Sequence, residues 1–290
     1  MSYVKRQIDV TCDLGLGPDG TDGFESVKMH GLRVSASIEI LGMPSMNKAT
    51  LQVYGMTLDL MNKFSRAGVL PLALRKNAVQ VNAGDAENGM ALVYGGIIGH
   101  AFQDLQAAPE VSFNIYAWTN QFAAVNPVAA NSYPATGDVA TIMRRLATQM
   151  GYDFESNGVS VQLANPYLFG TARMQMQSVA NAAHIYAFIE NEKTLVILDQ
   201  NKARGGTIPL IDVHHGMVGY PKLMNAGWIS VRTIFNPTVK FLGQINVQSG
   251  IKPMSGIWRV RKITHSLESE TPNGAWYTDI DASMFGADRA

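Results

Sequence analysis

Residues 228–282 alternate between apolar and polar side chains along four successive segments, and this pattern limits the possible folds more than any other feature. The four segments are residues 227–235, 240–249, 256–267 and 275–282. Successive side chains of a β-strand point to opposite faces, so alternation of this length predicts half-buried antiparallel strands. Asn236-Pro237 predicts a turn after the first segment, because proline fixes its own φ and keeps the preceding residue out of the helical region.

The third segment changes parity along its length. Trp258 and Val260 are apolar on one parity, whereas Ile263 and Leu267 are apolar on the other. A β-bulge produces such a switch, because one extra residue reverses which side chains face inwards. Bulges also help strands to curl. We therefore expect a small barrel or a strongly twisted sheet.

An earlier part of the chain repeats this order of segments. The matching segments are residues 49–55, 78–85, 90–105 and 111–117, and residues 56–65 replace the Asn-Pro turn. Spacing and turn positions agree, but residue identity mostly does not, so a duplication and a chance agreement between two β-meanders are both open. His100 and His265 occupy corresponding places, which favours a shared structural role over catalysis.

A helical pattern separates the two β blocks. Asp138 is placed to cap a helix that ends at Gly151, and a second helix is predicted to start at Thr171. A hairpin is predicted next, with strands at 185–189 and 194–198.

The predicted fold is therefore mainly β with an α+β insert, in three domains. Two β-barrel domains, residues 1–119 and 207–290, flank a small α+β domain at residues 120–206.

Charge composition narrows the class of partner. Lys plus Arg and Asp plus Glu number 23 each, so the formal net charge is zero, which argues against a protein that binds nucleic acid or an anionic membrane. Charged residues make up only 16%, against about 25% in typical proteins. A neutral surface favours coverage by protein partners, although a neutral soluble monomer has the same composition.

Other features limit the compartment. The single cysteine, Cys12, excludes an intrachain disulfide and a cysteine-based zinc site. The first ten residues do not resemble a signal peptide. The most apolar stretch, residues 90–102, contains three glycines and His100, which argues against a membrane helix. We expect a soluble protein made in a cytoplasm.

No pattern predicts an enzyme, a metal site or a cofactor. His214 and His215 are adjacent, so on an extended chain they point to opposite sides and do not suit one metal ion. Asp85 and Glu87 lie in a loop too short for EF-hand spacing, and a tight hairpin turn explains them equally well. Motifs of serine hydrolases and zinc proteases are absent from the sequence.

One apolar loop is a candidate interface. Residues 68–74 are apolar yet lie between predicted strands, so the loop either folds onto the barrel or is offered to a neighbour. We favour the second interpretation and predict Leu70, Leu72 and Leu74 as interface residues.

Several runs resemble the baseplate hub proteins of contractile phage tails, the counterparts of the central hub of T-even phages and of the hub of Mu-like phages. These runs are residues 51–65, 79–85, 90–104, 216–249 and 256–280. The most specific parts are Val218-Gly-Tyr-Pro221, Phe235-Asn-Pro237 and His265-Ser-Leu267. The likeness extends in order from about residue 30 to 284, and the chain is shorter than the largest hubs.

The resemblance implies a structural virion protein that is not an enzyme. Such hubs are similar to tail-tube subunits doubled within one chain, so a homotrimer supplies six barrels and matches a sixfold tube. The implied partners are the tail tube protein on one face, the central spike on the other and other baseplate proteins at the periphery. DNA passes only through the lumen, and the protein is made in the bacterial host cytoplasm. The alternatives are the hub of a bacteriocin or secretion-type injection machine, and a tail-associated cell-wall hydrolase.

Overall fold

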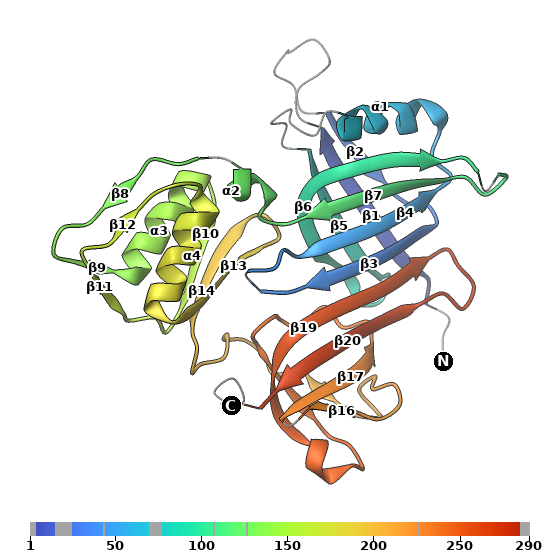
Figure 1. Cartoon of the computed structure of the whole chain (residues 1–290). Coiled ribbons are helices and arrows are strands. Elements are labelled where there is room, and N and C mark those ends of the chain that lie inside the picture. Colours follow the sequence, from blue (N-terminus) through green and yellow to red (C-terminus); the bar gives the residue numbers. More distant parts are fainter. Residues whose placement is uncertain are drawn as a thin grey trace. The chain divides into compact units, whose positions relative to one another are not determined.

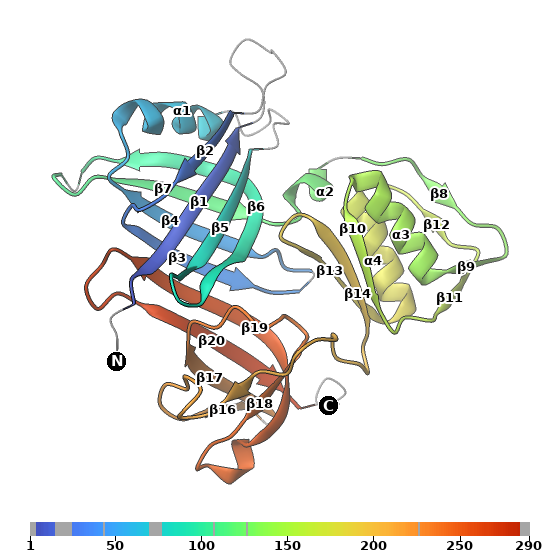
Figure 2. The same cartoon turned by 180° about the vertical axis from the view of Figure 1, so that it is seen from behind.

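A computed structural model shows a mainly β chain, as predicted (Figures 1 and 2). It describes residues 4–14, 25–42, 44–69, 77–106, 108–125, 127–225 and 227–284. The chain divides into two compact units. Unit 1 comprises Met1–Glu39, Lys48–Thr119 and Thr264–Tyr277, and unit 2 comprises Ile40–Asn47, Asn120–Ile263 and Thr278–Ala290. None of the described helices has the length and hydrophobicity needed to cross a bilayer.

Unit 1 is an antiparallel sheet with one helix. Its elements are β1 (Arg6–Leu14), β2 (Glu25–Met29), β3 (Val34–Ile40), β4 (Lys48–Tyr54), α1 (Leu58–Val69), β5 (Ala78–Asp85), β6 (Gly89–Asp104) and β7 (Ser112–Trp118). The strand order is β2-β1-β5-β6-β7-β4-β3. Thr57 caps α1, since its Oγ1 accepts the N–H of Leu60. Phe64 of α1 packs on Phe113 of β7, with ring centroids 5.9 Å apart.

The second β block contains six strands and one 3₁₀ turn. They are β15 (Leu210–Ile211), β16 (Lys222–Asn225), β17 (Trp228–Ile234), β18 (Gln244–Val247), η1 (Lys252–Met254), β19 (Gly256–Ser269) and β20 (Trp276–Ser283). The end of β19 and the start of β20 belong to unit 1. There, Ser269 Oγ accepts the N–H of Val34 and donates to the carbonyl of Leu32.

The two predicted β blocks have the same topology. Strands β4, β5, β6 and β7 pair in the order β4-β7-β6-β5, and strands β17, β18, β19 and β20 pair in the order β17-β20-β19-β18. In each block the first strand lies beside the fourth, the fourth beside the third and the third beside the second. This agreement supports a duplication.

Closed barrels are not seen in the described part of the chain. The strand order of unit 1 does not return to its first strand, and neither does the order β16-β17-β20-β19-β18-β15. The mainly β class is therefore confirmed, whereas two closed barrels are not. The division into residues 1–119, 120–206 and 207–290 stays a prediction.

Two details of the β blocks correct or refine the sequence analysis. Trp258 and Val260 are buried on one parity of β19 and Ile263 and Leu267 on the other, so the predicted switch is seen in the burial pattern. The shared role predicted for the two histidines is wrong. His265 is buried, and burial lowers its pKa to about 4, whereas His100 is exposed.

The α+β insert surrounds a core of its own. Its elements are α2 (Gln121–Val125), β8 (Asn131–Ser132), β9 (Thr136–Asp138), α3 (Val139–Met150), β10 (Asp153–Asn157), β11 (Gln162–Ala164), β12 (Tyr167–Leu168), α4 (Ala172–Ala183), β13 (Ile185–Glu190) and β14 (Thr194–Asp199). The predicted cap at Asp138 and the predicted helix start at Thr171 are confirmed. The Asp138 side chain accepts a hydrogen bond from the N–H of Thr141, and the Thr171 side chain accepts one from the N–H of Met174. The predicted hairpin is β13–β14.

Candidate assembly surfaces

The interface residues predicted from the sequence, Leu70, Leu72 and Leu74, lie outside the described residues. Their role therefore stays a prediction. In the described ranges no three His, Cys, Asp or Glu side chains are grouped so that they would hold a metal ion.

Two carboxylates close polar turns, and the first of these turns is the one predicted at Asp85. Asp85 Oδ1 accepts the backbone N–H groups of Glu87 and Asn88, which closes a tight hairpin turn. Asp212 Oδ1 likewise accepts the N–H groups of His214 and His215, so this pair belongs to a loop.

Strand β16 presents an exposed apolar edge in unit 2. It is the last strand of its sheet and, among the described strands, pairs only with β17. All four of its residues are exposed, and Leu223 and Met224 are apolar. The free backbone groups of an edge strand can pair with another chain, and natural edges are protected by short length, by charges such as lysine or by a covering element. Strand β16 is short and carries Lys222, but its exposed Leu223 and Met224 leave apolar area beside the free edge, so β16 is a candidate docking edge.

A strip of aromatic rings lies on the solvent side of β6 and β7. Phe102 stacks on Tyr116 with centroids 6.0 Å apart, and His100 meets the edge of Trp118 at 6.1 Å. His100 and Phe102 are exposed, and Tyr116 and Trp118 are half-buried. The strip offers apolar area with few rotatable bonds, a property of protein interfaces.

The hairpin β13–β14 joins the insert to the second β block within unit 2. One face of the hairpin packs on the insert helices through Ile185, Ala187, Ile189, Leu195 and Ile197. The opposite face packs into the core of the second block through Phe188, Val196 and Leu198. Alternation along each strand thus fills two cores with one hairpin.

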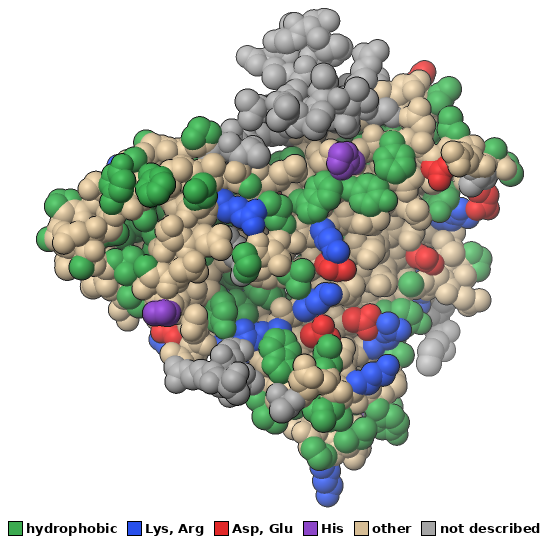
Figure 3. All heavy atoms as spheres, in the orientation of Figure 1, with side chains coloured by type: hydrophobic (Ala, Val, Ile, Leu, Met, Phe, Trp, Pro, Cys, Tyr) green, Lys and Arg blue, Asp and Glu red, His purple; other side chains and the backbone are tan. Residues whose placement is uncertain are grey.

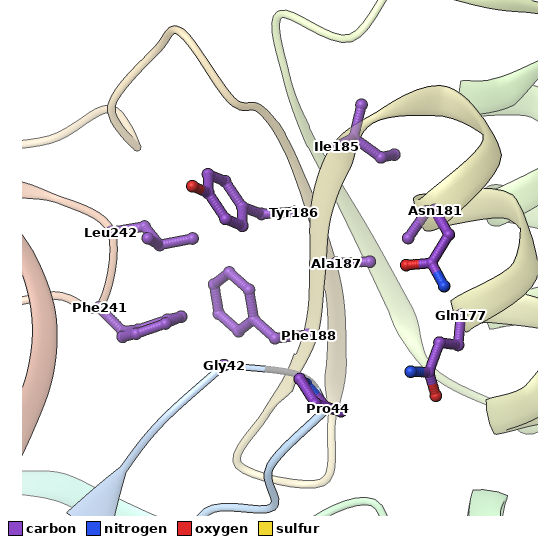
Figure 4. A pocket seen from close by; sticks show the side chains of 11 residues that line it. Gly42, Pro44, Gln177, Asn181, Ile185, Tyr186, Ala187, Phe188, Phe241 and Leu242 are labelled. Atoms are coloured by element: carbon purple, nitrogen blue, oxygen red, sulfur yellow. The ribbon is translucent and has the colours of Figure 1, made fainter. Parts of the chain in front are cut away.

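A small pocket of about 70 Å³ lies at this joint (Figure 4). Phe188 and Phe241 point toward one another there, edge to face, with centroids 5.0 Å apart. A Cβ at position 42 would come within 2.7 Å of the Phe241 ring, so Gly42 permits this approach. Pockets that bind small molecules are typically about 300–1,000 Å³. We interpret this pocket as a packing crevice.

Arg204 connects the insert to the second β block. Its buried guanidinium donates to both oxygens of Glu155 at 2.9 and 2.7 Å and to both oxygens of Glu190 at 2.6 and 2.8 Å. Its backbone N–H donates to the carbonyl of Leu242. Burial alone would lower the pKa of Arg204, but the two carboxylates raise it above its usual range. The hydrogen bonds from Arg204 likewise hold the pKa of Glu155 below its ordinary value.

Two arginines of β19 add further links. Arg259 is buried and donates to the backbone carbonyls of Gln200 and Lys202. Arg261 donates to the hydroxyl of Tyr186 on β13 and to Ser283. Both guanidinium groups lie within 5.6 Å of the Tyr186 ring centre, a cation–π distance.

Neither the contacts of these arginines nor the β16 edge was predicted from the sequence. Each arginine binds partners far along the chain, so no local spacing indicates the contact. The edge had a weak signal, because Leu223 and Met224 are adjacent apolar residues, so on a strand they point to opposite faces and one core cannot bury both.

A family model described as baseplate hub gp41 matches residues 8–278 of this chain. No curated protein matches it.

Solved structures of the same fold come from phage tails and from a secretion system. A tail protein from Neisseria meningitidis is 9% identical with a TM-score of 0.65, and the match covers 97% of each chain. The 43 kDa tail protein of prophage MuSo2 from Shewanella oneidensis is 9% identical with a TM-score of 0.59, covering 94% of this chain and 96% of that one. A type VI secretion component from E. coli, described as similar to the T4 tail proteins gp27 and gp5, is 8% identical with a TM-score of 0.56. The match covers 88% of this chain and 74% of that one.

Proposed function

We propose a function from one premise, that the chain belongs to the baseplate hub gp41 family, whose model covers most of its length. The protein is a structural hub of a phage tail baseplate, and its role is assembly. We further propose that it forms a homotrimer that joins a sixfold tail tube to a trimeric central spike around the DNA channel.

The shared topology of the two β blocks carries this proposal. Strand orders β4-β7-β6-β5 and β17-β20-β19-β18 give each chain two copies of one building block. Three chains then present six similar blocks, which suits docking on a sixfold tube, while the chains themselves keep threefold symmetry for a spike. A formal net charge of zero suits a ring that lets DNA pass without holding it.

The proposed contacts between neighbours use strand edges and apolar loops. The exposed edge of β16 can add a strand from an adjacent subunit through backbone hydrogen bonds. The loop that contains Leu70, Leu72 and Leu74 is proposed to pack on a neighbour in the same assembly.

Charged substitutions test these contacts. The pair Leu70→Asp and Leu72→Asp, and separately Leu223→Asp, should reduce the trimer fraction measured by light scattering and leave the far-ultraviolet circular dichroism unchanged. Loss of soluble protein would instead assign the loop to the core. An unchanged trimer fraction in both variants would contradict this choice of contacts.

A hub of a secretion-type injection machine is the second candidate. The match to the E. coli type VI secretion component favours it, as does a match to the structure of a Francisella PdpA–VgrG complex, with a TM-score of 0.58, 7% identity and coverage of 99% of this chain and 59% of that one. The genes beside this one distinguish the two, since a phage encodes capsid proteins and a secretion system does not.

A further inference from the structure

Two long stretches of the sequence carry no charged residue. They are residues 111–137 and 156–172, in a chain with 16% charged residues overall. Residues 120–137 of the first stretch and the whole of the second lie in the insert, which occurs once per chain, unlike the β blocks.

The structure brings the two stretches together as one surface. Strand β8 pairs with β12, and β9 pairs with β11. Between these short ladders, Tyr133 N–H donates to the carbonyl of Pro166, and Asn165 N–H donates to that of Ala135. We call residues 127–137 and 158–170 the neutral lobe. In Figure 3 the end of the insert shows patches of hydrophobic side chains among other uncharged atoms, with few charged side chains.

Two aromatic rings project from the neutral lobe. Tyr167 is 64% exposed and Phe169 is 63% exposed, and their centroids lie 6.0 Å apart. Met174, at the start of α4, is 52% exposed, and its sulfur lies close to Gly170. Large apolar side chains exposed together to this extent mark interaction sites in soluble proteins.

The rings are held on a rigid support. Leu168, between them in sequence, is buried in the insert core. The buried side chain of Gln175 donates to the carbonyls of Ala129 and Gly170 and accepts from the Asn131 amide at 2.9 Å. This network ties both edges of the lobe to α4. A preorganised aromatic pair loses little conformational entropy on binding.

The lack of charge on the neutral lobe favours a protein as its binding partner. Residues 127–137 and 158–170 themselves carry no charged side chain, so the centre of the lobe has little to attract nucleic acid or an anionic membrane. Charged side chains border the lobe: Lys202 donates to the carbonyl of Gly158, Arg145 lies over the Tyr133 ring, and Asp138 and Arg173 lie just beyond its ends in sequence. A polar rim around an apolar centre is the usual anatomy of a protein interface. Self-assembly in the proposed function uses the repeated β blocks, and the insert lies outside that repeat.

We propose that the neutral lobe is the docking site for a different baseplate protein, which receives Tyr167 and Phe169 in an uncharged apolar pocket. This inference rests on the proposed hub function and extends it by naming a surface. Because each chain carries one lobe, a trimeric hub binds three copies of this partner.

Binding of purified baseplate proteins tests the proposal. The full-length hub is immobilised, and each of the other baseplate proteins of the same particle is applied separately in biolayer interferometry. One of them should bind, and the double variant Tyr167→Ser, Phe169→Ser should bind it at least about 30-fold more weakly. Leu58→Ser is the matched control, because Leu58 is 59% exposed in unit 1, and it should bind as the wild type does.

Light scattering and vesicle flotation separate the other outcomes. The double variant should keep the oligomeric mass and the circular dichroism of the wild type. If the double variant misfolds, the single variant Phe169→Asn replaces it in the binding assay. The proposal is overturned if no baseplate protein binds the wild type, if the variants bind with unchanged affinity, or if their oligomeric mass falls, which would make the lobe a self-contact. Flotation of the wild type alone with phosphatidylcholine vesicles would also overturn it. A monomeric wild type that still binds through the lobe contradicts the trimer and leaves this inference intact.

Discussion

Lowering the pH from 7 to 5 should destabilise unit 1 through one residue, His265. Burial of this side chain lowers its pKa from 6.5 to about 4. Between these two values the unfolded chain binds a proton that the folded chain does not, so the free energy of unfolding falls as the pH falls. The proton linkage of a single site then predicts a loss of about 2 kcal/mol between pH 7 and pH 5.

Urea unfolding at both pH values, followed by tryptophan fluorescence, measures this loss. Carboxylates also titrate in this range, so the comparison is with His265→Gln, in which those groups remain. The wild type should lose about 2 kcal/mol more than the variant between pH 7 and 5. Equal losses in the two proteins would show that His265 is not buried as a neutral ring, and that the end of β19 does not pack as described.

Three further predictions concern unit 2 and the core. Arg204→Met leaves Glu155 and Glu190 without their shared cation and should lower the free energy of unfolding in urea by about 2 kcal/mol. The loss is smaller than for a fully buried ion pair because both carboxylates are partly exposed. Adding Glu155→Gln and Glu190→Gln should recover part of this loss, and no recovery would show that unpaired charge is not its cause. Burial raises the pKa of the Cys12 thiol, so a disulfide reagent at pH 8 should label it only in urea, and fast labelling of the native protein would contradict its burial. Asp138→Ala should lower stability by about 1 kcal/mol through loss of the α3 cap, whereas Asp138→Asn should not.

Local signals in the sequence predicted the regular elements well. The caps at Asp138 and Thr171 and the left-handed Gly151 that ends α3 depend on neighbours within one helical turn, so spacing alone locates them. The strand alternation likewise located β17, β19 and β20 to within two residues. Strand β18 is shorter than expected, because Leu242 adopts φ +58° and the chain turns before Gln244.

Contacts between distant residues were not predictable in the same way. Arg204 binds Glu155, which lies 49 positions away, and any of the chain's carboxylates would have fitted the sequence equally well. His100 and His265 have matching positions in the repeat but different environments, since burial depends on what covers each strand. The open sheets differ from the expected barrels for the same reason, because closure depends on pairing between the first and last strands.

Electron microscopy of the purified assembled hub tests the central claim most directly. The account predicts a ring of three chains in which six similar β blocks alternate around the channel, because each chain carries the same four-strand order twice. A ring of six chains, or particles that remain monomers in the presence of the tube and spike proteins, would contradict it.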